Sequence, residues 1–166
     1  MQSKLNIKEN SVVTFSFKKA IINFTWAYII VTILAYSISF LAAIVFKLPF
    51  LGGSPFDEPA FVMTVPYHLL INLLVWTFFG YLYFKKKQTN QYHLKEALYL
   101  SCYWLVIAMI VDLVGFVLIK SPVSLTPYQF YVEYQPWISI TYLIVFISPL
   151  IGYAIVKYKR VSLVNG

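Results

Sequence analysis

An acidic residue, Asp112, stands deep within a long apolar stretch at residues 94–119. About 20 consecutive apolar residues can cross the hydrocarbon core of a bilayer, so the sequence places this carboxyl group at membrane depth. A charge there costs at least ~2.5–3.5 kcal/mol on insertion scales, and such residues are usually paired, directed into the protein and functional. Asp112 is therefore the strongest indication of chemistry in the chain, although alone it does not identify an activity.

A second ionisable residue, His68, falls at a similar depth in the preceding apolar stretch, residues 61–84. At 1.5 Å per residue, Asp112 lies about 12 Å and His68 about 11 Å from the same side of the membrane. Thr64 and Asn72 precede and follow His68 at four-residue spacing, which puts the three on one helix face. The pattern predicts an intramembrane polar site of Asp112, His68, Asn72 and Thr64. A His68–Asp112 pair within it could take up and release a proton near neutral pH, as proton relays and coupled transporters do.

The same four residues also fit a purely structural interpretation. In a membrane bundle they would form a hydrogen-bonded cluster between helices, in which each bond contributes ~0.6–2 kcal/mol. This interpretation is favoured for His68. A functional role is slightly favoured for Asp112, because a carboxylate costs more to hold at that depth than an imidazole or an amide does.

Other kinds of chemical site are disfavoured. A metal centre needs three or four ligands, and no ligand motif with the usual spacing is present. A nucleophile needs an activating base, and Ser101 and Cys102 are more than two helical turns from Asp112. Cys102 is the single cysteine of the chain, so it cannot form an intrachain disulfide, and it is interpreted as a small buried apolar residue. The sequence predicts neither a bound metal nor a cofactor.

The elements that must position these residues are apolar helices. Of the 166 residues, 60% are hydrophobic and 11% are charged, whereas soluble domains carry roughly 25% charged residues. The apolar residues gather in four blocks, each near the ~20 residues that a helix needs to span a bilayer. This pattern predicts an all-α, integral membrane four-helix bundle that occupies the whole chain, 1–166, as a single domain. Its spans are expected at about 20–46, 61–84, 94–119 and 137–156.

The basic residues define the expected orientation. Most of the 13 lysines and arginines fall in the N-terminal tail, near the connection between the second and third spans, or in the C-terminal tail. Cytoplasmic segments of membrane proteins carry such an excess, so both termini are predicted inside the cell. The extracytoplasmic side is then expected to carry the acidic residues Asp57, Glu58 and Glu133.

The net charge of +7 is explained by this topology and does not require a nucleic-acid partner. Nucleic-acid binding would need a basic surface with base-reading or stacking groups, and the sequence offers none. Lys85, Lys86 and Lys87 are expected to contact anionic lipid headgroups instead. The expected location is the cytoplasmic membrane, and the bias toward lysine, isoleucine and tyrosine favours a bacterial source.

Aromatic residues make up 19% of the chain, and many lie where the spans should meet the headgroups. Trp26 and Tyr28 are interpreted as part of an interfacial belt on the cytoplasmic side. The dense run at residues 128–134 is assigned to a belt on the opposite side, where it could lie flat on the membrane. Two alternatives are that this run caps the bundle or docks a partner.

Small residues indicate which helix faces approach one another. Ser101, Ala108 and Gly115 are seven residues apart, and together they predict a packed face beside Asp112. Pro149 is expected to kink the fourth span.

Three functions are compatible with these features. The short loops and the absence of a catalytic motif favour a non-enzymatic accessory, regulatory or immunity-type subunit. Such a protein would act through helix–helix contacts with another membrane protein or with a second copy of itself. The alternative is a small oligomeric transporter or channel with Asp112 and His68 in its pathway. A membrane-embedded enzyme that modifies lipid is the weakest of the three.

Overall fold

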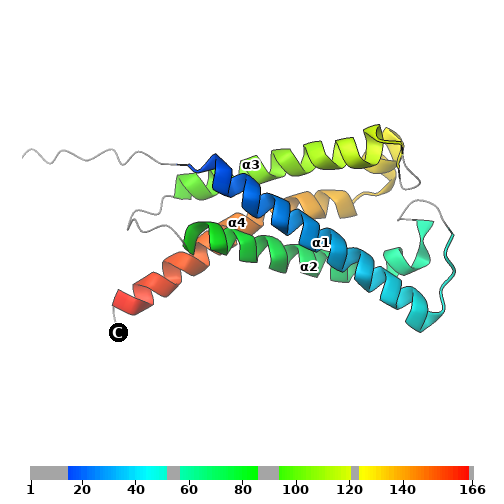
Figure 1. Cartoon of the computed structure of the whole chain (residues 1–166), viewed down its shortest axis with the longest axis horizontal. Coiled ribbons are helices and arrows are strands. Elements are labelled where there is room, and N and C mark those ends of the chain that lie inside the picture. The colour runs from blue at the N-terminus through cyan, green and yellow to red at the C-terminus, as the bar shows by residue number, and fades with distance from the viewer. Residues whose placement is uncertain (1–14, 52–56, 86–93, 121–123, 165–166) are drawn as a thin grey trace, which may run out of the picture.

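The computed structural model describes residues 15–51, 57–85, 94–120 and 124–164 (Figure 1). Within these ranges all regular secondary structure is helical. Four helices are long and apolar enough to cross a membrane, as the four hydrophobic blocks predict. The elements in chain order are α1 (Phe17–Phe46), α2 (Pro59–Lys85), α3 (Leu94–Asp112), the π-helix η2 (Leu113–Leu118), the short π-helix η3 (Gln129–Glu133) and α4 (Trp137–Val164).

Two helix limits differ from the prediction. Helix α1 begins at Phe17 and not near residue 20, and α4 continues well past residue 156 to Val164. The expected spans ended where hydropathy falls, but lysine and arginine are good helix formers, so a helix does not stop at the membrane boundary.

The helices are arranged with α2 against both α1 and α4, and with α3 against α4. Helix α1 crosses the bundle diagonally and meets α3 over a short length only (Figure 1). We call the end that holds Phe17, Lys85 and Leu94 the proximal end, and the end that holds Phe46 and Trp137 the distal end. Figure 1 shows the last turns of α4 at the proximal end, which is also the end where α1 begins.

The proximal half of the bundle is tightly packed around aromatic side chains. The indoles of Trp76 and Trp104 are fully buried, with ring centroids 5.4 Å apart. Phe24 packs on Trp76 at 5.2 Å, and the Trp104 indole donates a hydrogen bond to the carbonyl of Ala20 (3.0 Å). These contacts join α1, α2 and α3 around one core that α4 completes through Val145, Tyr153 and Val156.

Helices α2 and α4 cross at two glycines. A Cβ on Gly152 would lie 2.5 Å from the backbone nitrogen of Tyr81 and 2.7 Å from the carbonyl carbon of Gly80. A Cβ on Gly80 would lie 3.0 Å from the Cα of Pro149. Small residues allow helices to approach this closely where there is no water to drive association.

A buried polar cluster closes the proximal end. The carboxylate of Glu96 is 1% exposed and accepts a hydrogen bond from the Tyr83 hydroxyl (3.0 Å). That hydroxyl in turn accepts a hydrogen bond from the backbone N–H of Ser16 (3.2 Å), and the Lys19 ammonium donates to the Tyr83 carbonyl. The cluster holds the start of α1 against the end of α2 and the start of α3.

The aromatic run near the distal end caps the bundle, which was one of the alternatives that the sequence left open. Phe130 and Tyr134 are buried with Leu125, and Phe116 and Ile138 pack against them. Tyr128 and Tyr131 from the same run are exposed, so one side of this segment is not covered by the rest of the described protein.

The predicted small-residue face is only partly present. Ser101 and Ala108 are buried, but Gly115 is exposed and nothing lies within 4 Å of a Cβ placed on it. Gly115 belongs to η2, whose wider turn is visible in the Ile119 N–H bond to the Val114 carbonyl, five residues back. A π-helical turn holds more residues than an α-helical turn, so the seven-residue spacing no longer returns to the same face.

The prediction that Cys102 is buried is wrong. Its side chain is exposed on the outer surface of α3. In a membrane bundle an apolar side chain gains no more from the protein interior than from lipid, so hydrophobicity alone does not bury it.

Candidate functional site

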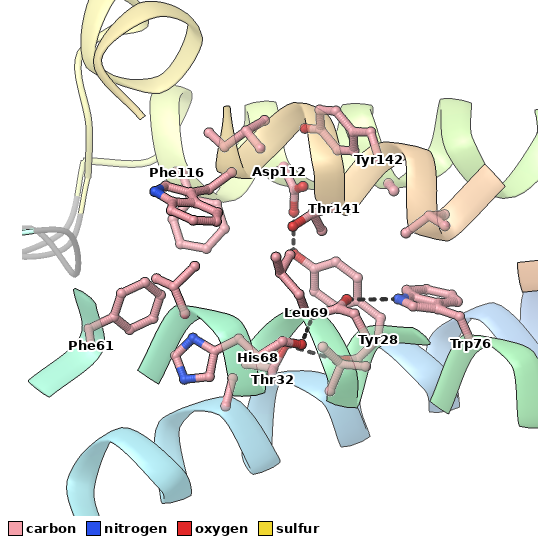
Figure 2. A pocket seen from close by; sticks show the side chains of 18 of the residues that line it. Tyr28, Thr32, Phe61, His68, Leu69, Trp76, Asp112, Phe116, Thr141 and Tyr142 are labelled. Atoms are coloured by element: carbon pink, nitrogen blue, oxygen red, sulfur yellow. Dashed lines mark hydrogen bonds between the residues drawn. The ribbon is translucent and has the colours of Figure 1, made fainter. Parts of the chain in front are cut away.

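A cavity of about 200 Å³ lies in the distal half of the bundle, and residues of all four long helices line it. Figure 2 shows it between α1 and α2 on one side and α3, η2 and α4 on the other. Its lining is mostly apolar. The aromatic side chains that face it are Tyr28, Tyr36, Phe61, Trp76, Phe116, Phe130, Trp137 and Tyr142.

Asp112 lines this cavity at the point where α3 passes into η2. The Tyr28 hydroxyl donates a hydrogen bond to its Oδ1 atom (2.5 Å), and Figure 2 shows this bond reaching across the cavity. The Tyr142 side chain lies beside the same carboxyl group. Asp112 therefore joins α3 to α1, with α4 adjacent. A hydrogen bond to a carboxyl group among apolar side chains offsets part of the cost of holding it there.

Sequence reasoning missed both tyrosine neighbours of Asp112. Tyr28 was assigned to an interfacial belt, but the structure places it inside the bundle with its hydroxyl on Asp112. Depth was counted as if every helix stood upright. Helix α1 crosses the bundle diagonally (Figure 1), so a count of residues along α1 does not give the depth of Tyr28 in the bundle. The sequence did carry one signal of this placement: Tyr28 lies eight residues inside the predicted span at residues 20–46, and not at its boundary.

His68 also lines the cavity, from the α2 side. Its Nε2 atom is hydrogen-bonded to the hydroxyls of Ser39 (3.0 Å) and Thr64 (3.1 Å). Those two hydroxyls are 2.9 Å apart, so the three side chains form a closed, buried triangle between α1 and α2.

The predicted direct pair of His68 and Asp112 is not formed. Each side chain has other hydrogen-bonding partners, and the two residues occupy opposite walls of one cavity (Figure 2). The physical reason is the order of packing: α2 packs along α1 and α4, whereas α3 packs along α4. Helices α2 and α3, although consecutive in the sequence, therefore do not pack closely along their length.

Asn72 is buried and satisfied within α2. Its amide nitrogen donates to the carbonyl of His68 (2.9 Å), and its oxygen accepts from the Trp76 indole (3.0 Å). Together with the bonds of Thr64, these contacts match the structural interpretation of the α2 residues. Asp112 differs from these α2 residues. Its carboxyl group points into the cavity from the place where the α-helix α3 becomes the π-helix η2.

The other predicted site residues lie away from the cavity. Asp57 and Glu133 are exposed at the distal end, and Glu58 accepts hydrogen bonds from the backbone N–H of Leu51 (3.0 and 3.1 Å). Lys85 is exposed at the proximal end, with its ammonium 5.7 Å from the ring centre of Tyr81. Lys86 and Lys87 lie outside the described residues. In the described part of the chain, no three histidine, cysteine or acidic side chains are grouped closely enough to hold a metal ion.

Fold and site together define an all-helical protein of the multi-pass membrane type, with an aromatic cavity and one carboxylate in its distal half. Large apolar side chains from each long helix are more than half exposed, as lipid-facing residues are: Ile33, Leu74, Val106 and Leu143. No family model, curated protein or solved structure matches the chain. The function must therefore be inferred from the cavity itself.

Proposed function

We propose that this protein is a small transporter of the bacterial cytoplasmic membrane, with the cavity as its solute site and Asp112 as its charged group. The proximal end, with Lys19, Lys85 and the basic last turns of α4, would face the cytoplasm, in keeping with the usual excess of basic residues there. The distal end, with Asp57 and Glu133, would face outward. The helices are long enough for this placement.

The observation that carries the proposal is a carboxylate directed into an aromatic cavity between helices. An accessory subunit that acts through its outer faces needs no such cavity. An unfilled space of about 200 Å³ lined by apolar side chains also lacks the packing contacts that a filled interior would make, which carries a cost. An internal carboxylate adds a further cost on insertion. Both features are easier to explain if the cavity binds something.

The two halves of the bundle suggest how access could alternate. The proximal half is closed by the aromatic core and by the Glu96 cluster, whereas the distal half contains the cavity. The solute site would thus lie between this closed half and the distal segment that carries Leu125 and Phe130. Asp112 sits at the α3–η2 junction, and π-helical turns within helices are common at functional sites. A change in the hydrogen bonds of Asp112 is therefore well placed to alter how α1 and α4 pack on α3.

Uptake into proteoliposomes tests the proposal. Initial uptake rates of tetraethylammonium, phenylacetate and erythritol would be measured under an imposed proton gradient and membrane potential. We expect protein-dependent uptake of at least one of these solutes, reduced at least tenfold in Asp112→Asn. Glu133→Gln is the matched control, because it removes an exposed distal carboxylate outside the cavity and should leave uptake unchanged.

Two results would overturn the proposal. One is an absence of protein-dependent uptake for every solute with correctly folded protein. The other is uptake that Asp112→Asn and Glu133→Gln affect equally. Co-purification of a larger membrane protein that Asp112→Asn does not disturb would instead favour the accessory role.

A further inference from the structure

The charges around the cavity restrict what it can bind. Asp112 is the acidic residue of the lining, and no lysine or arginine is among the lining residues that the structure describes. His68 is hydrogen-bonded to Ser39 and Thr64 in a buried triangle and not to Asp112. The cavity thus offers an acidic group without a lysine or arginine beside it, which disfavours an anionic ligand.

The aromatic lining restricts the ligand further. Tyr28 donates a hydrogen bond to the carboxyl group of Asp112, and Tyr142 lies beside that group. Phe116 lines the cavity on the same side as Asp112 (Figure 2). Aromatic faces near a carboxylate favour organic cations, because the ring quadrupole attracts positive charge and the ring surface accepts apolar groups. A small inorganic cation would need several oxygen ligands, and this mostly apolar lining does not supply them.

The size of the cavity indicates the size of the ligand that it would surround. A cavity of 150 Å³ in a protein interior can hold benzene, whereas drug-sized ligands occupy clefts of about 300–1,000 Å³. At about 200 Å³ this cavity suits a molecule somewhat larger than benzene, of roughly ten non-hydrogen atoms.

From the carboxylate, the aromatic lining and the volume, we infer that the cavity binds a small organic monocation, a compact alkylammonium or arylalkylammonium ion. The charge lies at Asp112 and the apolar body contacts Phe116 and the rings of Tyr28 and Tyr142. This inference names the substrate class of the proposed transporter and rests on that function. It excludes carboxylic acids and large multi-ring drugs as solutes.

Binding to the purified protein in nanodiscs of phosphatidylglycerol tests the class. The probes are phenethylammonium and its near-isosteres 2-phenylethanol and phenylacetate, together with tetraethylammonium, measured by isothermal titration calorimetry. We expect phenethylammonium to bind at least tenfold more tightly than 2-phenylethanol, and phenylacetate to show no binding. Asp112→Asn should remove this preference, whereas Asp57→Asn, on an exposed distal residue, should keep it.

A second variant keeps the test decisive if Asp112→Asn does not fold. Thr141 lines the cavity with Asp112, so Thr141→Phe reduces the volume while the carboxylate remains. It should weaken phenethylammonium binding at least tenfold, with an unchanged circular dichroism spectrum. Equal binding of cation and alcohol by the natural protein, or an unchanged affinity in folded Thr141→Phe, would overturn the inference.

A separate experiment must distinguish a free solute from a lipid as the ligand, because the headgroup of a lipid can also carry an ammonium group. Phosphatidylethanolamine added to the nanodiscs should leave phenethylammonium affinity unchanged within twofold. A tenfold loss would assign the cavity to a lipid and overturn the free-solute assignment. Failure of this inference is distinguishable from failure of the transport function: Asp112-dependent uptake of phenylacetate or erythritol would sink only the cation class, and cation binding without any uptake would sink only transport.

Discussion

The crossing of α2 and α4 gives the prediction whose magnitude follows most directly from the structure. Gly152→Ala places a methyl group 2.5 Å from the Tyr81 backbone nitrogen, about 0.9 Å short of ordinary contact, which begins at 3.4 Å. The opposing atoms belong to the backbone of α2, so no side-chain rotation relieves the overlap. The two helices must move apart.

The free energy of this separation can be bounded. Overpacking of this kind costs typically 1–3 kcal/mol, and a gap of 0.5–1 Å forfeits a quarter to a half of each dispersion contact along the crossing. Alanine returns up to about 1 kcal/mol through its better helix propensity. We therefore expect Gly152→Ala to lower the free energy of unfolding by about 1–2 kcal/mol.

Gly115→Ala is the matched control, because its new methyl group meets nothing within 4 Å. This change should be neutral or stabilise the protein by up to about 1 kcal/mol. Reversible unfolding in mixed micelles titrated with sodium dodecyl sulfate, followed by far-ultraviolet circular dichroism, measures both variants. The reasoning is refuted if Gly152→Ala is as stable as the natural protein, or if Gly115→Ala destabilises it to the same extent.

Two further predictions concern the proximal end and the outer surface. Tyr83→Phe removes the hydroxyl that bonds both Glu96 and the Ser16 N–H, and should cost about 1.5–3 kcal/mol in the same unfolding titration. Tyr153→Phe should cost less than about 0.5 kcal/mol, since the Tyr153 hydroxyl makes no hydrogen bond within the described residues; equal losses in the two variants would contradict the role of the cluster. Cys102 is exposed on α3, so Cys102→Leu should change the free energy of unfolding by less than about 0.5 kcal/mol in the same titration. A loss of more than about 1.5 kcal/mol would show that this face is covered by protein.

The sequence was informative about the four helices for a simple physical reason. A bilayer demands about 20 apolar residues per span, and that requirement is local in the chain. It placed the helices within a few residues, except at the C-terminal end of α4, where helix formation continues beyond the apolar segment. Asp112 was found by the same reasoning, because an acidic residue within such a segment is conspicuous without any knowledge of its neighbours.

The neighbours themselves depend on helix packing, which hydropathy does not encode. Lipid is as apolar as the protein interior, so the apolar pattern does not tell a buried face from a lipid-facing one. This is why Cys102 and Gly115 were expected inside and Tyr28 at the membrane boundary. Glu96, one of the most buried polar residues, carried no signal beyond an acidic residue close to a basic connection.

Asp112 illustrates the difference between what the sequence determines and what the tertiary structure determines. The sequence by itself determined that a carboxyl group lies within an apolar helix, because the cost of that placement depends on the chain segment alone. Only the tertiary structure decided that its neighbours are Tyr28 and Tyr142 and not His68, and that all of them surround one aromatic cavity. That decision rests on the diagonal course of α1 and on the packing of α3 along α4, which arise from contacts between residues far apart in the sequence.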